Sequence, residues 1–150
     1  MRVRSIVIIA IALLALIVSA IGYAQVKRPF HDGSVWDISF IRMKPGMEVA
    51  YMNYLASDWK RNMEASKKAG LILSYKVIGT ESHGPNDFNL MLMTEYKDLA
   101  TMEANQDKGD ALAQQVVGDD KTQMQGYRDR SEIREMMGDR LSREIILEPK

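Results

Sequence analysis

Two polar side chains, Asp37 and Ser39, lie two residues apart in a run of β-forming residues from Val35 to Met43. Because side chains alternate across a strand, both occupy the same face, and Tyr75 on a later strand could join them. In an apolar pocket, such groups could hold a phenolic substrate and take its proton. The plainer interpretation, which we favour, places Asp37 at the exposed end of the strand, since no partner base stands beside it.

A second polar pair, Asp58 and Asn62, lies one helical turn apart inside an otherwise apolar helix face. Burying such groups is costly unless they are hydrogen-bonded. The pair therefore belongs either to a ligand pocket or to the water-exposed edge of the face. Tyr51 and Trp59 on the same helix are most simply core aromatics at helical spacing, and they would line a pocket if one lies beside the pair.

Metal and cofactor chemistry finds little support in the sequence. His31 and His83 are isolated, whereas a metal site needs several ligands at suitable spacing. Met91 and Met93 could offer two thioethers to Cu(I), but without a neighbouring His or Cys we interpret them as packing residues. The absence of cysteine excludes disulfides and iron–sulfur ligation. We predict no metal and no cofactor, and we find no nucleophile triad and no phosphate-binding glycine loop.

The first residues indicate export to the periplasm or the extracellular space. Arg2 and Arg4 precede an unbroken apolar run, Ile6–Val18, and small residues follow up to Ala24. This is the layout of a secretory signal peptide, and we predict cleavage after Ala24. Cleavage after Ala20 and an uncleaved anchor are the alternatives, although the run is shorter than the ~20 residues of a spanning helix.

Charge limits the partners of the chain, which has 20 basic and 20 acidic residues. A mixed surface offers no basic stripe for phosphates, so we predict no nucleic-acid partner. It also offers no electrostatic hold on anionic lipid, so we predict no stable membrane association after signal cleavage. We interpret the mixed-charge run Arg128–Arg140 as the solvated face of a helix, with Arg128 and Glu132 placed one turn apart to pair.

The rest of the chain predicts one α+β domain, residues 35–147, preceded by a mobile polar arm, residues 25–34. Alternation, helical spacing and turn residues predict strands at 35–43, 71–78, 88–96 and 141–147, helices at 47–69 and 98–104, and a split or kinked helical region at 110–137. The order β-α-β-β-α-β is that of ferredoxin-like folds, in which helices cover one face of a four-stranded antiparallel sheet.

The third predicted strand is apolar on both faces. Phe88, Leu90 and Leu92 lie on one face and alternate with Met91 and Met93 on the other. A strand that is apolar on both sides must be covered on both, and the predicted helices can cover only one. A second copy of the sheet, packed about a two-fold axis, is the simplest cover. The sequence therefore predicts a homodimer with Met91 and Met93 at its interface.

Several local patterns together carry a family resemblance over residues 35–147. They are the first strand leading into Met43-Lys44-Pro45-Gly46, the helix aromatics Tyr51, Tyr54 and Trp59, the helix end Ala69-Gly70, and the segment Glu95-Tyr96-Lys97-Asp98-Leu99-Ala100. The chain resembles the dimeric α/β-barrel superfamily, which includes antibiotic-biosynthesis monooxygenases, NIPSNAP-like proteins and stress-responsive barrel proteins. The resemblance implies that two sheets close a barrel, with one pocket per subunit between sheet and helices. It does not fix an activity, since this group includes oxygenases, isomerases, haem-handling enzymes and proteins with no known activity.

The haem-degrading members of this group use an Asn on the first strand, a Trp on the helix after the third strand and a His on the long second helix. Here the first position falls near Ser39, the segment from Asp98 to Asn105 has no Trp, and the helical stretch after it has no His. We therefore do not expect haem breakdown.

These observations predict an exported homodimer that binds a small apolar or aromatic ligand between its sheet and its helices. One alternative is a cofactor-independent monooxygenase or isomerase acting on an aromatic or polyketide-like molecule, and another is a purely structural or interaction role. Whether the chain is an enzyme stays open. The residues that we predict to line the pocket are Asp37, Ser39, Tyr51, Asp58, Trp59, Asn62 and Tyr75.

Overall fold

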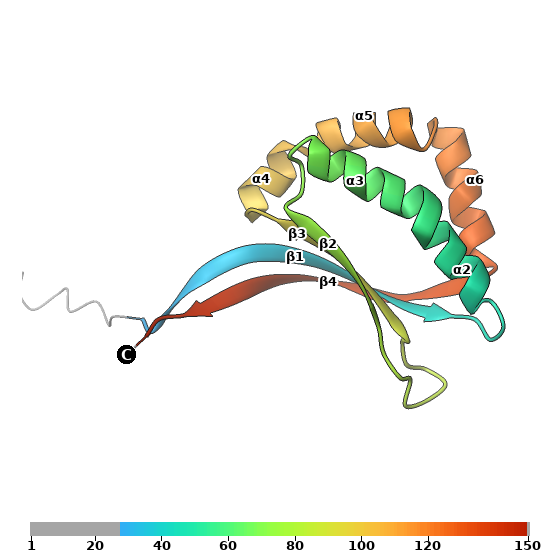
Figure 1. The fold of residues 1–150 in the computed structure, drawn as a ribbon, viewed down its shortest axis with the longest axis horizontal. Helices are drawn as coiled ribbons and strands as arrows, with labels where there is room; N and C mark the ends of the chain where they lie inside the picture. Colours follow the sequence, from blue (N-terminus) through green and yellow to red (C-terminus); the bar gives the residue numbers. More distant parts are fainter. Residues whose placement is uncertain (1–27, 150) are drawn as a thin grey trace, which may run out of the picture. The chain divides into compact units, whose positions relative to one another are not determined.

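The computed structural model describes residues 28–149, and the predicted signal peptide lies outside them. Residues 31–146 form one compact unit. The described residues on either side belong to a second unit, in which the Glu148 N–H donates to the Pro29 carbonyl (2.8 Å). The elements in chain order are β1 (Phe30–Met43), α2 (Glu48–Tyr54), η1 (Leu55–Trp59), α3 (Lys60–Lys68), β2 (Ser74–Gly79), β3 (Leu90–Tyr96), α4 (Leu99–Ala104), α5 (Gln106–Val116), α6 (Asp120–Ser131) and β4 (Arg134–Leu147) (Figure 1).

The strands form one four-stranded sheet in the order β2-β3-β1-β4, so β3 and β1 are its central strands. β1 and β3 are antiparallel, with Ile41 opposite Leu90. β2 and β3 are also antiparallel, with Val77 opposite Leu92. This arrangement confirms the predicted α+β class and the four-stranded antiparallel sheet of a ferredoxin-like fold.

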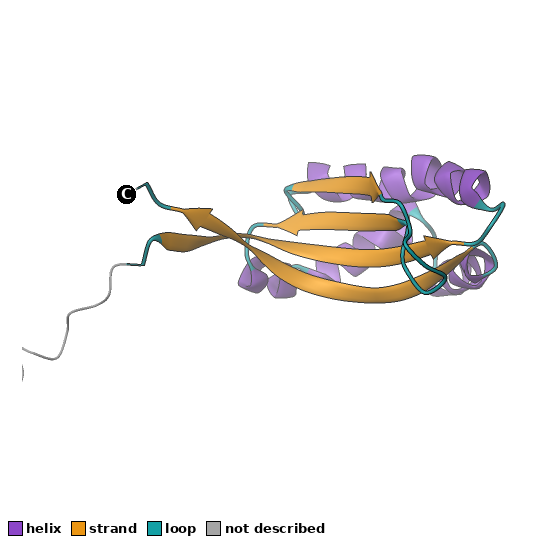
Figure 2. Cartoon of the chain, turned by 90° about the horizontal axis from the view of Figure 1, so that it is seen from below, coloured by secondary structure: helices purple, strands orange, loops and turns teal. Residues whose placement is uncertain are grey.

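The helices lie on one face of this sheet, as Figures 1 and 2 show from two directions. Beneath them, Ile41 and Leu90 of the central strands pack with Tyr51 and Leu55 of the long helix, our name for the continuous run of α2, η1 and α3, and all four side chains are buried. Removing this apolar surface from water is the main stabilising contribution of the layer. Because Asp37 alternates in step with Ile41, it lies on the same covered face of β1.

The predicted helix at 47–69 forms from Glu48 to Lys68, but its middle segment, η1, is a π-helix. In an α-helix, residues four apart drift sideways by about 40° at each step, because 3.6 residues complete a turn. The wider π-helical turn, with its i→i+5 hydrogen bonds, reduces that drift. Tyr51, Leu55 and Trp59 therefore stay in line over the sheet. The helix is followed by Gly70 at φ +71°, the predicted left-handed position.

The opposite face of the sheet carries no helix from the described part of the chain (Figure 2). We call it the open face. The middle of this face is apolar and half-buried, and it consists of Trp36, Ile38 and Phe40 of β1 and Met91 and Met93 of β3, whereas Arg42 and Glu95 lie on the same face toward its two ends. The sheet is thus apolar on both faces, as the sequence predicts, and the described helices cover only one.

Phe88 corrects one detail of that prediction. Its ring lies edge-to-face against the ring of Phe40, with the centroids 4.7 Å apart. Phe88 therefore belongs with the open face and not with Leu90 and Leu92. It precedes the first residue of β3, so the alternation of strand side chains does not extend to it.

β1 starts at Phe30, so residues 30–34, the later part of the predicted mobile arm at 25–34, form a strand. Gly33, in the segment that we predicted as an arm, permits a close approach of β4. A Cβ atom at this position would lie 2.9 Å from a carboxylate oxygen of Glu144. The Ser34 hydroxyl donates to the same carboxylate (3.2 Å), and Arg143 pairs with Asp32 (2.8 Å). Contacts made across 110 residues of chain thus order a segment that looks like a loop locally.

β4 is the largest departure from the predicted elements. We expected residues 132–137 to be helical, and the strand to begin only at Leu141, but β4 begins at Arg134. The Lys44 N–H donates to the Ile133 carbonyl (3.0 Å), and Arg42 forms an ion pair with Glu135. The helix-forming character of Arg, Glu and Met is therefore overridden by pairing with the long β1.

An aspartate caps each of two helices. Asp98 accepts a hydrogen bond from the Thr101 N–H (2.6 Å) and caps α4, as predicted. The helical region after it splits at Gly118, whose φ of +130° ends α5, and Asp119 caps α6. None of the helices within residues 28–149 is long and apolar enough to cross a membrane.

Candidate functional site

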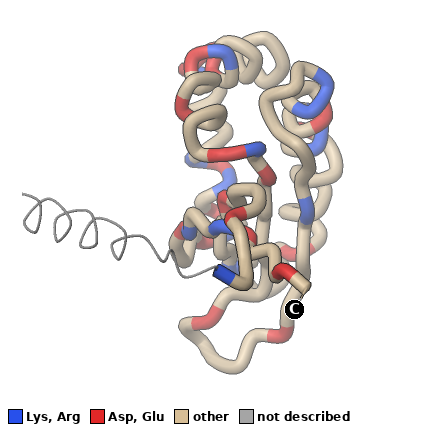
Figure 3. The backbone as a smooth tube through the Cα atoms, turned by 90° about the vertical axis from the view of Figure 1, so that its left-hand side faces the viewer, with Lys and Arg blue, Asp and Glu red and all other residues tan. Residues whose placement is uncertain are grey.

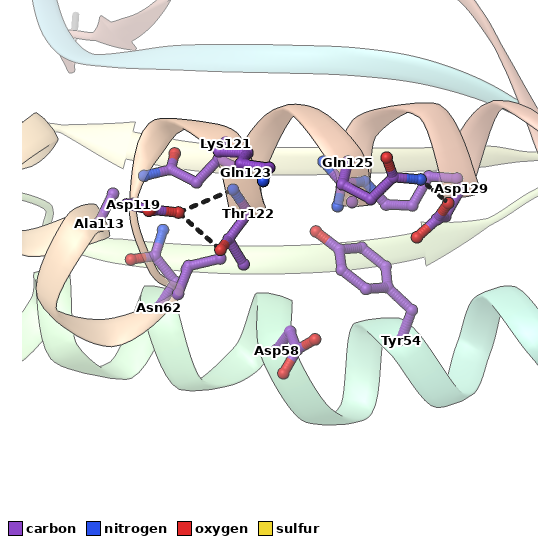
Figure 4. Close-up of a pocket in the computed structure, with 13 residues that line it drawn as sticks. Tyr54, Asp58, Asn62, Ala113, Asp119, Lys121, Thr122, Gln123, Gln125 and Asp129 are labelled. Atoms are coloured by element: carbon purple, nitrogen blue, oxygen red, sulfur yellow. Dashed lines mark hydrogen bonds between the residues drawn. The ribbon is translucent and has the colours of Figure 1, made fainter.

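A groove of about 760 Å³ lies between the long helix and the α5–α6 segment. Tyr54, Asp58 and Asn62 form its wall on the long helix (Figure 4). The other wall consists mainly of polar residues of α6 and of the turn before it, among them Asp119, Lys121, Thr122, Gln125, Asp129 and Arg130. The sequence predicted an apolar pocket between sheet and helices, whereas this groove runs between helices and is mostly polar.

The long-helix wall follows from the same geometry that aligns the core residues. Tyr54, Asp58 and Asn62 are spaced four apart across η1, so they form a second row beside the buried one. Asp58 pairs with the exposed Arg61 (2.9 Å). The side-chain oxygen of Asn62 is buried and has no hydrogen-bond partner. A buried acceptor without a donor is unfavourable, and Asn62 is the residue of this wall that carries one.

On the α6 wall, hydrogen bonds hold most of the side chains in place. Asp119 accepts from the hydroxyl of Thr122 (2.6 Å) and from its N–H (2.9 Å), and these bonds hold the pKa of Asp119 below its usual range. Gln125 donates to Asp129 (2.8 Å). Figure 4 shows both sets of bonds along the groove. Arg130 is the last of these side chains along α6. It forms no ion pair with a carboxylate within the described residues.

Two tyrosines and two arginines meet at the Arg130 end of the groove. The rings of Tyr51 and Tyr54 are stacked, with centroids 5.8 Å apart. The Arg130 guanidinium lies 4.7 Å from the centre of the Tyr54 ring, and that of Arg134 lies 5.5 Å from the centre of the Tyr51 ring. Burial raises the pKa of Tyr51 to about 12, although the charges of both arginines act against this shift. Tyr51 is therefore a neutral hydroxyl at physiological pH.

The polar residues predicted on β1 form a separate cluster. The Ser39 hydroxyl donates to Asp139 of β4 (2.6 Å). Burial raises the pKa of Asp37, and the negative charge of Asp139 raises it further. Burial also raises the pKa of Tyr96, and Asp37 adds to that effect. Asp37 and Ser39 do not line the groove between the helices.

Trp59 and Tyr75 form a third group, at the edge of the sheet that β2 forms. Their rings meet edge-to-face with centroids 5.2 Å apart. The Tyr75 hydroxyl donates to Glu64 of α3, and this hydrogen bond, together with a smaller effect of burial, raises the pKa of Tyr75. Neither aromatic residue lines the groove.

Of the predicted pocket residues, the structure therefore places only Asp58 and Asn62 in the groove, with Tyr51 buried behind its arginine end. The arginines were missed because Arg128–Arg140 was interpreted as the solvated face of one helix. Arg130 instead ends α6 and Arg134 begins β4. A usable signal was Gly126 one turn before Arg130, since a Cβ there would lie 3.0 Å from an Nη atom of Arg130.

Charge and metal-binding groups are dispersed. Basic and acidic residues are interspersed along the tube in Figure 3. His83 lies 3.9 Å from Asp87 in an exposed loop. Within the part of the chain that the structure describes, no three His, Cys, Asp or Glu side chains come close enough to share a metal ion.

No protein family model matches the sequence, and no curated protein matches it. Among solved structures, the chain is similar to the crystal structure of a NIPSNAP family protein with unknown function from Agrobacterium tumefaciens. The two share 15% sequence identity at a TM-score of 0.48, over 80% of this chain and 94% of the other. NIPSNAP-like proteins are among the groups that the sequence resembles. The fold assignment itself follows from the strand order and pairing of this chain.

Proposed function

We propose that this chain is the subunit of a homodimer and binds a small organic ligand in the groove between the long helix and α6. The observation that carries the ligand-binding proposal is the buried, unpartnered side-chain oxygen of Asn62 in the wall of a 760 Å³ groove. A cavity of this size is within the range of small-molecule sites. The lining offers both donors and acceptors, so we expect a ligand with polar groups on a compact frame.

The open face supports the homodimer. Its central residues, such as Phe40 and Met91, are apolar and only half-buried in a single chain. Exposed apolar patches of this kind mark interaction sites. Because a two-fold axis brings the same patch of both copies together, a second open face is its natural complement.

The alternative activity, a cofactor-independent monooxygenase or isomerase, would rest on Asp37. A carboxylate with a raised pKa is a better general base than an ordinary one. Asp37 stands outside the groove, however, so substrate bound there would not meet it. We therefore favour binding over catalysis for the groove.

Native mass spectrometry of the full chain, purified from its own host, tests the ligand-binding proposal. We expect each chain to carry a small molecule. Ala113→Trp places an indole in the groove and should abolish that added mass. Ala111→Trp is the matched control, because Ala111 is exposed on the same helix and does not line the groove. Bare chains in both variants and in the wild type would contradict the proposal.

A further inference from the structure

Two arginine side chains at one end of the groove are charged, partly buried and without a carboxylate partner in the described residues. Arg130 lines the groove, and Arg134 lines a separate, smaller cavity of about 330 Å³. The Nε atom of each is buried and has no hydrogen-bond partner. Arg134 donates to the sulfur of Met136, which is a weak acceptor. An arginine always carries its charge, so leaving two of them unpaired is costly.

The carboxylates nearest to this pair along the chain are engaged elsewhere. Glu135 forms an ion pair with Arg42, and Asp129 accepts a hydrogen bond from Gln125. Both guanidinium charges act on the pKa of Tyr51 and on that of Tyr54, so both lie near this pair of rings. Neither arginine forms an ion pair within the described residues, although Asp58 and Asp129 also line the groove.

Each of the two guanidinium groups lies over a tyrosine ring. A guanidinium that lies over an aromatic ring contacts it through its face, and its N–H donors point outward in the plane. Stacking of Tyr51 on Tyr54 holds both platforms together. Gly126 leaves the space in which the Arg130 side chain lies, since a Cβ atom there would come within 3.0 Å of it. Tyr51, Tyr54 and Gly126 are positioning residues in this arrangement.

We propose that Arg130, with Arg134 as a second positive charge, binds an oxyanion, the carboxylate or phosphate group of the ligand that occupies the groove. This inference rests on the proposed ligand-binding function. A planar fork of N–H donors matches both kinds of oxyanion and can bind them with two parallel hydrogen bonds. The acidic group would lie at the Arg130 end, and the rest of the ligand would extend toward the unpartnered acceptor of Asn62.

Calorimetric titration of the full chain tests this assignment with three probes: benzoate, inorganic phosphate, and benzamide as the neutral counterpart of benzoate. We expect one of the two anions to bind at least about tenfold more tightly than benzamide, because a charge-assisted hydrogen bond is lost in the amide. Tighter binding of benzoate identifies a carboxylate ligand, and tighter binding of phosphate identifies a phosphorylated one.

Arg130→Gln should weaken anion binding by about tenfold or more, and Arg134→Gln should weaken it less. Arg128→Gln is the matched control, since Arg128 is exposed on the same helix and does not line the groove. Arg130→Lys keeps the charge and the ring contact, so it tests the fork geometry if Arg130→Gln does not fold. Its anion affinity should fall between those of the wild type and Arg130→Gln.

If neither benzoate nor phosphate binds more tightly than benzamide, and these affinities are unchanged in Arg130→Gln, the oxyanion assignment is overturned and the groove remains a binding site. Failure of both anions to bind would overturn it as well, and a small molecule retained in the native mass spectrum would then show that the proposed function survives. If both Ala113→Trp and Arg130→Gln still carry the retained molecule, the ligand binds elsewhere, and this result would contradict both proposals.

Discussion

The two faces of the sheet have similar side chains but different surroundings. On the covered face, Ile41 and Leu90 are buried at 0% and 3% exposure beneath the long helix. On the open face, Phe40 and Met91, each adjacent in sequence to one of these residues, are also apolar but remain half-buried. An alternating strand thus carries two apolar faces, of which the described residues of one chain cover only one. Our proposal of a homodimer rests on the face that they leave open.

The covered face should be the more sensitive to truncation. Leu90→Ala removes buried methyl groups and leaves a cavity, so we expect the free energy of unfolding to fall by about 2–5 kcal/mol. Leu141→Ala, at a side chain that is 53% exposed, is the matched control and should have a much smaller effect. Urea denaturation followed by circular dichroism measures both. Equal losses would show that the buried cluster is not the core of this unit.

A charge placed on the open face should weaken dimer formation more than it weakens folding of the chain. Met91→Asp places a carboxylate in the proposed interface, where burial of an unpaired charge is strongly unfavourable. We expect sedimentation of this variant to give half the mass of the wild type. Val49→Asp, at a residue of α2 that is 72% exposed, should sediment as the wild type does. An unchanged mass for Met91→Asp would move the interface away from this face.

Polar residues on the covered face should respond to pH. Burial, and then the charge of Asp139, raises the pKa of Asp37 in the folded protein. The folded state therefore binds the proton more tightly than the unfolded state, and this carboxyl contributes less stability as pH rises from about 3.8 through its raised pKa.

Asp37→Asn should consequently stabilise the protein at neutral pH, and the gain should disappear in acid. Asp110→Asn, at an exposed carboxyl of α5, is the control and should give no such pH-dependent gain. Thermal unfolding at several pH values makes the comparison. A gain that persists below the ordinary carboxyl pKa would show that charge burial is not its cause.

The smallest effect should arise in the helix layer that covers the core. Asp119→Ala removes the cap of α6, so we expect a lower melting temperature at neutral pH. Because the folded-state pKa of Asp119 is lowered, the stabilisation is present above its unfolded pKa and is lost as pH falls through the folded value. Asp119→Asn retains a capping oxygen without the charge. Its melting temperature should exceed that of Asp119→Ala, and a lower value would contradict the capping role.

Local pattern was sufficient for the covered face. The four-residue spacing of Tyr51 and Leu55 predicts the helix face that packs on the sheet. The alternation of Leu90 with Met91 predicts which side chains of β3 lie beneath the helices. The π-helical turn of η1 was not visible in the sequence, since its residues are ordinary helix formers and the distortion depends on packing.

Long-range pairing explains what the sequence did not predict. The first residues of β4 and the segment around Gly33 are ordered by contacts between the two ends of the domain. The groove was only half predicted for the same reason. Asp58 and Asn62 are one turn apart and stand out as a pair, but Arg130 reaches the same groove from α6, which is remote in sequence.

Light scattering of the wild-type chain over a range of concentrations tests most directly whether the open face is an interface. We predict a mass of two chains that persists on dilution, because an apolar sheet face of this kind is unfavourable in water. A folded protein with the mass of one chain at every concentration would contradict the account.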